Sequence, residues 1–215
     1  MKMMTALGAL AAIGFPAGVA VAFEQADLDR FLATNECEGC DLTDVGTALA
    51  GRDSSGANLA GADLSDSNYL RSAILNDADF EAALFFDARF LDSSAIASVF
   101  VNADMTDVGI INSFMRGADF SGAVLMNANI ENTDLRDALL IGANLAGAQI
   151  TGALLGGANL TGANLSDATL DRSSVGDANF TDADLTGATI TRMSLSAAIL
   201  CRTIMPDGSV NNDDC

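Results

Sequence analysis

The chain has 215 residues, with no histidine, no tryptophan and a single lysine, Lys2. Without histidine, it lacks the usual general base near neutral pH and the commonest metal ligand in proteins. Without a lysine beyond the second residue, it also lacks the amine that Schiff-base chemistry needs. These absences argue against an enzyme, and we expect no catalytic residues, no cofactor and no metal site.

Positive charge is scarce throughout the chain. There are 10 basic and 29 acidic side chains, and the formal net charge is −19 at pH 7. A chain this acidic repels nucleic acids, anionic membrane surfaces and other polyanions. We therefore expect it to bind a protein and not a nucleic acid.

Residues 1–22, MKMMTALGALAAIGFPAGVAVA, differ in composition from the rest of the chain. One cation, an apolar run and the ending Ala20-Val21-Ala22 are typical of a cleaved signal peptide. The alternative is a retained membrane anchor, but Pro16 interrupts an apolar stretch that is already near the lower length limit for spanning. We expect cleavage after Ala22, no stable membrane insertion of the mature chain, and a periplasmic or secreted location, where disulfides persist.

The remaining sequence repeats with a period of five. In residues 78–200 a small residue, usually alanine, stands two positions before a large apolar residue, which we term the centre of the unit. Counting centres in steps of five from 80 to 200 gives 25 uninterrupted units. A one-residue insertion is expected near Leu75–Asp77, after four earlier units centred on Leu59, Leu64, Tyr69 and Ile74.

This period predicts a chain that turns a corner in every unit. Extended chain sends residues i and i+2 to the same side, so the small and the large apolar residue of a unit both face inward. The other residues of the unit must turn, and they are often of types that tolerate turn geometry. Repeated corners wind the chain into a solenoid of stacked coils. The corner residues include Gly117, Gly122, Gly142, Gly147, Gly152, Gly157, Gly162, Gly187, Asp87, Asn112 and Asp137.

The segments ANLTGANLSDATL and ADFSGAVLMNANI fit the motif Ala-(Asp/Asn)-Leu-x-x, and residues 57–200 resemble the pentapeptide-repeat proteins. The resemblance implies an all-β solenoid, a right-handed quadrilateral β-helix with four units per coil. The 25 units then make just over six coils, roughly 30 Å long at about 4.8 Å per coil. Some acidic members of this family resemble B-DNA and bind type II topoisomerases, which gives an alternative function. A signal peptide would place this chain away from any chromosome.

On this interpretation, four segments follow one another along the chain. They are a signal peptide (1–22), an N-terminal cap (23–56), the β-helix (57–200) and a C-terminal cap (201–215). The N-terminal cap is expected to contain a short amphipathic helix that covers the first coil, followed by an irregular first coil. The apolar residues at roughly helical spacing are Phe23, Leu28, Phe31 and Leu32.

The four cysteines form two pairs at opposite ends of the sequence. A zinc site or crossed disulfides would need the pairs close together, whereas the expected rod separates them by about 30 Å, against a limit of about 7 Å between Cα atoms. We therefore expect the local disulfides Cys37–Cys40 and Cys201–Cys215. A redox role for Cys37-Glu-Gly-Cys40 is the alternative, although no βαβ pattern surrounds it. The tail from Cys201 resembles the closing segment of many exported members of the family.

Aspartate or asparagine often stands just before the centre of a unit. In the family motif this residue faces water, and that is our expectation here. Calcium binding by these acidic ladders is the alternative, but it rests on aspartate density alone. The residues include Asp79, Asp104, Asp119, Asn144, Asn159 and Asp184.

Ten apolar residues occupy positions that the register sends outward. Five of them recur two coils later, so their side chains should align about 10 Å apart. Such a patch on an acidic rod indicates a contact surface for an unidentified protein or for a second copy of the chain in a homodimer. The alternative is a duplication of two coils whose apolar residues are merely tolerated. The ten residues are Leu84, Phe86, Val99, Val101, Phe114, Val124, Met126, Leu139, Ile141 and Leu154.

These observations together predict a non-enzymatic, exported scaffold that presents a rigid β-helical surface for protein–protein interaction.

Overall fold

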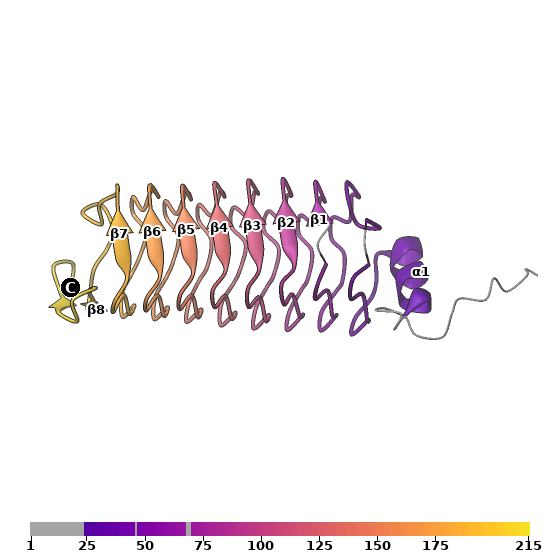
Figure 1. Ribbon diagram of the computed structural model, residues 1–215, viewed down its shortest axis with the longest axis horizontal. Coiled ribbons are helices and arrows are strands. Elements are labelled where there is room, and N and C mark those ends of the chain that lie inside the picture. The colour runs from indigo at the N-terminus through magenta and orange to yellow at the C-terminus, as the bar shows by residue number, and fades with distance from the viewer. Residues whose placement is uncertain (1–23, 46, 68–69) are drawn as a thin grey trace, which may run out of the picture.

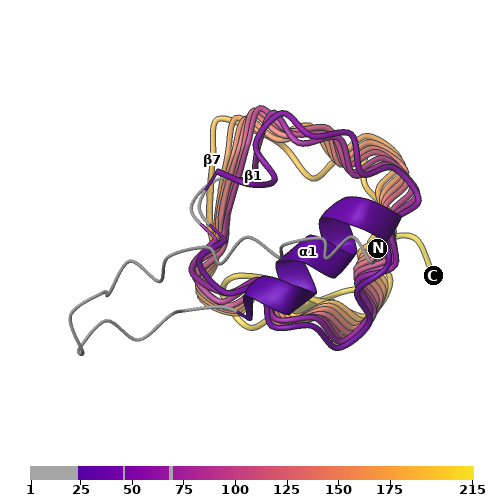
Figure 2. The ribbon, with the colours of Figure 1, turned by 90° about the vertical axis from the view of Figure 1, so that its right-hand side faces the viewer.

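The computed structural model describes residues 24–45, 47–67 and 70–215. The predicted signal peptide lies outside these ranges. The described chain winds into a four-sided tube, with one helix at its N-terminal end and a small hairpin at its C-terminal end (Figures 1 and 2). Within these ranges, no helix is long and apolar enough to cross a membrane.

Seven short strands of the described chain form a parallel sheet in sequence order along one side of the tube. Each strand pairs with the strand one coil further on, as Phe90 does with Ile110. Because four units of five separate these partners, each unit supplies one side of the cross-section, and the predicted β-solenoid is confirmed. The strands are β1 (Leu70–Arg71), β2 (Arg89–Leu91), β3 (Gly109–Ile111), β4 (Asn129–Glu131), β5 (Gln149–Thr151), β6 (Thr169–Asp171) and β7 (Thr189–Thr191).

The centres of the units fill the axis of the tube. Leu145, Leu165 and Leu185 are fully buried, and the residues just before them pair in register from coil to coil, so these leucines form one column. Six serine or threonine residues that replace the inward alanine bond to backbone through their hydroxyls: Ser93, Ser98, Ser113, Thr133, Ser173 and Thr203. Ser98 Oγ, for example, donates to the carbonyl oxygen of Leu75 at 2.6 Å. The core is therefore a stack of equivalent positions whose buried hydroxyls can pair with the previous coil.

The corners are made by residues in the left-handed backbone region. All the corner residues identified from the sequence have positive φ, for example 53° at Asn112 and 60° at Asp137. At Gly157, where φ is 70°, an added Cβ would lie 2.7 Å from a carboxylate oxygen of Asp137 in the preceding coil. Glycine at that corner is thus favoured both by its backbone conformation and by its close neighbour.

The insertion lies earlier than the sequence predicts. Leu70 pairs within the sheet, and both it and Leu75 are 1% exposed, whereas Ile74 is 37% exposed. The units are therefore centred on Leu70 and Leu75, so the insertion near 75–77 was a wrong prediction and the extra residue precedes Leu70. Tyr69 itself lies outside the described residues. In each of these two units, two large apolar residues are adjacent in the sequence, and either could be the inward centre. Pairing with the next coil selects Leu70 and Leu75.

The first coil is longer still. Glu36 bridges to Asn58 and Asp41 bridges to Asp63, so these partners are two positions further apart than four units of five. Both bridges are parallel, so the extra residues are absorbed while the coils continue to stack. One place for them is the segment from Leu42 to Leu49, two buried residues that stand seven positions apart where later centres are five apart.

The helix α1 (Gln25–Thr34) lies across the N-terminal end of the tube (Figure 2). It buries Leu28 and Phe31 against the first coil and leaves Leu32 38% exposed. It ends at Asn35, whose φ of 62° is the left-handed conformation common at helix ends. The short helix predicted from the sequence is thus present, although Phe23 lies outside the described residues.

The C-terminal end is closed differently. Strands β8 (Thr203–Ile204) and β9 (Val210–Asn211) form an antiparallel hairpin that the period of five did not predict. Ile204 also bridges to Asp184, so β8 continues the last coil before the chain turns back.

Both expected disulfides are present. Their Cα–Cα distances are 5.3 Å for Cys37–Cys40 and 4.9 Å for Cys201–Cys215. One lies beside α1 and the other ties the end of the chain to the last coil.

Candidate protein-contact surface

The sides of the tube are numbered here in chain order, starting from the side that carries β1–β7. The second, third and fourth sides follow around each coil. Their central residues begin with Leu75, Phe80 and Phe85 respectively and recur every fourth unit.

The ten apolar residues singled out from the sequence all have solvent-accessible side chains, but they do not lie on one side. Seven are exposed, with Phe114 at 55% the highest, and Val99, Val101 and Val124 are half-buried. Phe114 and Leu154 lie on the second side. The third side carries Val99, Val101, Leu139 and Ile141, and the fourth carries Leu84, Phe86, Val124 and Met126.

In the columns of residues that stand just before the centres, apolar residues alternate with polar ones. On the third side, Val99 bridges to Asp79 below it and to Asp119 above it. On the fourth side, Asp104 stands between Leu84 and Val124 in the same way. The two-coil period therefore produces a chequered surface, in which each apolar side chain just before a centre has polar neighbours one coil away.

The outward aspartates and asparagines have a structural role in the turns. Asp104 Oδ1 accepts a hydrogen bond from the backbone N–H of Thr106 at 3.1 Å and another from its hydroxyl at 2.7 Å. Asn164 does the same for the N–H of Ser166 at 3.0 Å. This Asx-turn satisfies a backbone donor beside the corner, which explains why the motif prefers these two residue types. The acidic ladders are therefore part of the turn architecture.

The arginines pair with aspartates or with the N-terminal cap. Arg52, in the first coil, lies over the ring of Phe31, 5.4 Å from its centroid. The other ion pairs of the described residues lie along the first and second sides or near the two ends. They are Arg30–Asp27, Arg71–Asp92, Arg89–Asp87, Arg116–Asp137, Arg136–Asp134, Arg172–Asp171, Arg192–Asp171 and Arg202–Asp182.

Asp171 has the most enclosed of these carboxylates, with a side chain only 7% exposed. Arg192 Nε donates to its Oδ1 at 2.7 Å, and Arg172 Nε lies 3.2 Å from its Oδ2. The hydrogen bond from Arg192 lowers the pKa of Asp171, and Arg202 lowers the pKa of Asp182 in the same way. These carboxylates are thus held charged by their own arginines.

Over four successive coils, the third and fourth sides lack the arginines that form ion pairs along the first and second sides. We call this region the apolar–acidic surface, and it comprises residues 79–87, 99–107, 119–127 and 139–147. It contains eight of the ten outward apolar residues and no lysine or arginine. Its six acidic residues are Asp79, Glu81, Asp87, Asp104, Asp107 and Asp119. The sequence analysis identified the apolar residues but did not note that this surface lacks lysine and arginine. The position of each arginine in the repeat would have shown that absence.

The same two sides change character in the following coils. The columns of Phe86 and Ile141 continue as Ser166 and Thr181. Asn159, Asn164 and Asn179 stand before the centres there. The apolar–acidic surface therefore has a defined C-terminal limit.

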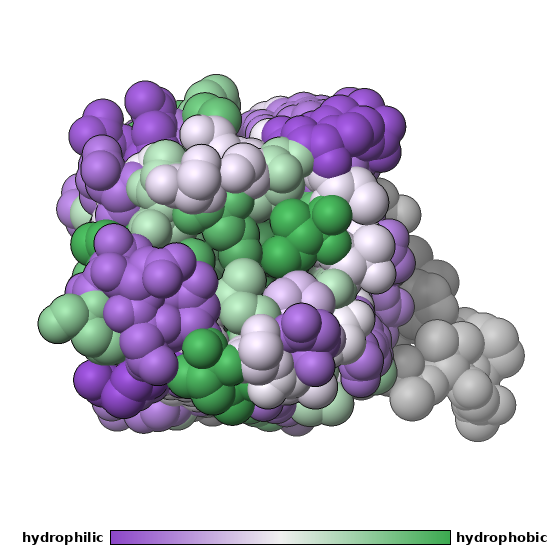
Figure 3. Space-filling model, turned by 90° about the vertical axis from the view of Figure 1, so that its left-hand side faces the viewer, coloured by the Kyte–Doolittle hydropathy of each residue, from purple (hydrophilic) through white to green (hydrophobic). Residues whose placement is uncertain are grey.

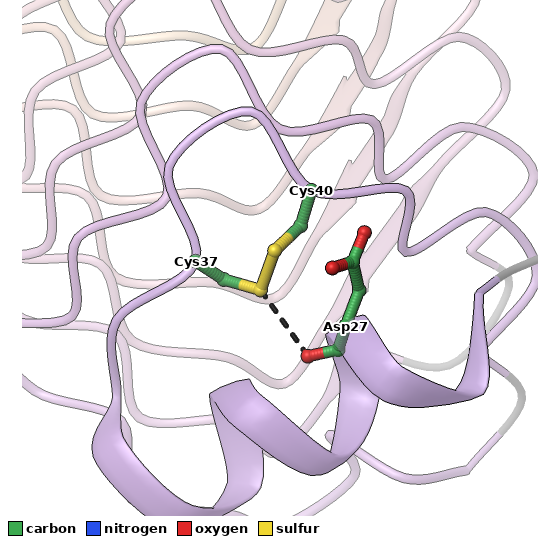
Figure 4. A group of neighbouring side chains, drawn as sticks. All are labelled: Asp27, Cys37 and Cys40. Atoms are coloured by element: carbon green, nitrogen blue, oxygen red, sulfur yellow. Dashed lines mark hydrogen bonds between the residues drawn. A yellow bond between two sulfur atoms is a disulfide. The ribbon is translucent and has the colours of Figure 1, made fainter.

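Asp27, Cys37 and Cys40 form the one cluster of candidate metal-ligating groups among the described residues (Figure 4). The two cysteines are joined in a disulfide and are at most 2% exposed. Cys37 Sγ lies 3.2 Å from the carbonyl oxygen of Asp27, whose carboxylate accepts the N–H of Asp41 at 3.0 Å. The disulfide thus packs between the helix and the first coil, which favours a structural role over the redox alternative.

The C-terminal end of the tube shows apolar side chains at its middle, within a polar rim (Figure 3). Ile190, Met193 and Met205 pack against the core there but remain partly exposed. The hairpin therefore covers this end less completely than α1 covers the other. The sequence alone did not indicate this second apolar area.

A family model described as pentapeptide repeats matches residues 103–140, 138–175 and 178–206, with eight copies. No curated protein matches the chain.

Several solved structures are similar. HetL from the cyanobacterium Nostoc sp. strain PCC 7120, a pentapeptide repeat protein involved in heterocyst differentiation regulation, is 25% identical over 76% of this chain and 89% of its own, with a TM-score of 0.28. Full-length QnrB1, a plasmid-mediated fluoroquinolone resistance protein, is 25% identical over 72% and 80%, with a TM-score of 0.35. A pentapeptide repeat protein from the Arabidopsis thaliana thylakoid lumen is 29% identical over 56% and 66%, with a TM-score of 0.21.

Proposed function

Because this chain belongs to the pentapeptide-repeat proteins, we propose that it is a non-enzymatic scaffold whose rigid side binds another protein. The coils stack through continuous backbone ladders and a fully buried core, so the outer side chains are held in fixed relative positions. Such a surface needs little reorganisation on binding, which favours affinity.

One observation carries this proposal. Large apolar side chains such as Phe86 and Ile141 are 49% and 40% exposed at outward positions, whereas the equivalent positions two coils or more towards the C-terminus hold Ser166 and Thr181. The repeat can therefore be built with polar residues at these positions. Exposed apolar area that the fold does not require is typical of an interaction surface.

The test compares two double variants at equivalent positions. Phe86→Ser with Ile141→Ser should abolish capture of the protein partner, while Ser166→Ala with Thr181→Ala should leave it unchanged. Capture is measured by cross-linking and mass spectrometry on the exported fraction, and circular dichroism verifies that both variants fold. If the first variant retains both partner capture and any self-association, the proposal is wrong.

We place the protein in the periplasm or outside the cell. Two disulfides and the signal-like residues 1–22 support this location. Mass spectrometry of the mature protein from fractionated cells should give an N-terminus at Phe23 in the exported fraction.

The alternative function is an acidic DNA mimic that binds a type II topoisomerase. The net charge of −19 favours it. The ion pairs of Arg116 and Arg136 on the second side interrupt a uniformly negative surface. An intact Met1 in a cytoplasmic fraction would support this alternative and exclude export.

A further inference from the structure

We propose that the apolar–acidic surface binds an amphipathic, positively charged α-helix of a partner protein, lying along the tube over the corner between the third and fourth sides. This inference rests on the proposed function and specifies the shape and charge of the partner. Three features of the surface support it: the zigzag of its apolar residues, their axial spacing, and the absence of cations.

The apolar residues alternate across this corner from coil to coil. The first of the four coils carries Leu84 on the fourth side, and the second carries Val101 beside the corner on the third. The third coil carries Val124 on the fourth side, and the fourth carries Ile141 on the third. A ligand along the corner therefore meets one apolar contact per coil, alternately on its left and right.

This zigzag has the spacing of a helix seam. Successive coils are about 4.8 Å apart. In a heptad pattern the a and d residues also alternate across the seam, one every 3.5 residues on average, which is about 5.3 Å along the axis. Over the three steps of this surface the two spacings differ by only about 1.5 Å in total. An extended strand fits worse, because its side chains alternate about every 3.3 Å.

The charge of the surface indicates which polar residues the partner helix carries beside its apolar seam. Asp79, Asp104 and Asp119 accept hydrogen bonds from turn N–H groups, and none of them has an ion pair among the described residues. Asp87 is already paired with Arg89 at 2.7 Å, so it contributes less. Lysine or arginine beside the apolar seam of the ligand would meet these three carboxylates, of which Asp104 lies between Leu84 and Val124 and Asp119 lies between Val99 and Leu139.

A second copy of this chain fits the surface poorly. It would place the same unpaired carboxylates opposite one another on a molecule with a net charge of −19. Like charges brought together in this way disfavour association. The helix is therefore assigned to a different protein.

The experiment uses the full folded chain and three synthetic peptides of about 18 residues. The first has leucine at a and d and lysine at e and g. The second has the same composition with the leucines distributed around the helix, and the third replaces lysine with glutamate. Fluorescence anisotropy should show the first peptide binding at least about tenfold more tightly than either of the others, and the circular dichroism of the mixture should show a gain in helix.

Two sets of variants identify the site. Leu84→Ser with Ile141→Ser should weaken binding of the first peptide at least about tenfold, whereas Ser166→Ala with Thr181→Ala should not change it. Asp104→Asn with Asp119→Asn keeps the acceptor of the Asx-turn, as Asn144 and Asn164 show elsewhere. This variant should weaken binding about two- to tenfold and reduce its dependence on salt.

Equal binding of the scrambled peptide, or unchanged binding by Leu84→Ser with Ile141→Ser, would overturn the inference. So would a dimer in sedimentation that the same variant dissociates, because the surface would then bind a second copy. If partner capture is lost in Phe86→Ser with Ile141→Ser but no helical peptide binds, the proposed function stands and only the helical partner is wrong.

Discussion

In residues 78–147 phenylalanine is the commonest residue on the axis of the tube, whereas in residues 158–197 leucine is. The rings of Phe80, Phe100 and Phe120 stack one coil apart, with centroids 4.9 Å from each other. The aromatic part also carries the apolar–acidic surface, while the later part has a skin of asparagine, threonine and serine. A small apolar gap lies where the stack gives way to aliphatic residues, lined by Ile110, Phe120, Leu125, Ile130, Leu135 and Leu140.

The backbone register is the same in both parts. From β1 to β6, every strand residue pairs with its equivalent four units further on. The difference shows that the ladder and corners define the fold, while core volume and outer chemistry vary independently of it. Because each coil contacts mainly its neighbours, the two parts should respond separately to substitution.

The largest expected effect is on the aromatic stack. Phe100→Ala should lower the free energy of unfolding by about 3–5 kcal/mol, because Phe100 is fully buried and its ring contacts four other rings. Leu160→Ala, in the leucine part, should cost about 2–5 kcal/mol and less than Phe100→Ala. Urea unfolding followed by circular dichroism measures both. Equal losses would show that ring stacking adds nothing to the burial of apolar area.

A smaller effect is expected at the C-terminal end. Cys201→Ser with Cys215→Ser should cost about 3 kcal/mol, because the disulfide closes a loop across a sequence separation of 14. Amide hydrogen exchange should show faster opening of β8 and β9, with residues 78–147 unchanged. Uniformly faster exchange along the whole chain would contradict the independence of the two parts.

The smallest effect concerns acid. Arginine hydrogen bonds lower the pKa of Asp171 and Asp182 in the folded state. Such groups contribute stability that is fully present above their unfolded pKa of about 3.9 and is lost as pH falls through the lower folded value. Asp171→Asn should therefore lower the melting temperature by no more than about 3 °C at pH 6 and by less at pH 2. A loss that is independent of pH would mean that Asp171 acts through packing alone.

Much of the architecture could be predicted from the sequence because the repeat dictates it. The period of five specified which residues face inward, and the corner residues do adopt positive φ. The register of the two units centred on Leu70 and Leu75 could not be predicted, because Tyr69-Leu70 and Ile74-Leu75 each offer two large residues for one inward position. Which of the two residues faces inward is decided by backbone pairing between neighbouring coils. The sequence alone does not show that pairing.

The candidate protein-contact surface could be predicted from the sequence only in part. The ten outward residues follow from the repeat, but their distribution over three sides depends on how many units complete a coil. The C-terminal hairpin was missed because it departs from the repeat, and its two strands are only two residues each. The partly covered apolar area beside it was missed for the same reason.

The four-unit register also limits how such a molecule can change length. Duplicating one whole coil lengthens the solenoid and leaves every outward residue on the same side. Duplicating a single unit of five between Leu84 and Val124 would rotate everything beyond it by a quarter turn, so these two residues would lie on different sides of the tube. Insertions that preserve a binding surface along one side must therefore add five-residue units in multiples of four.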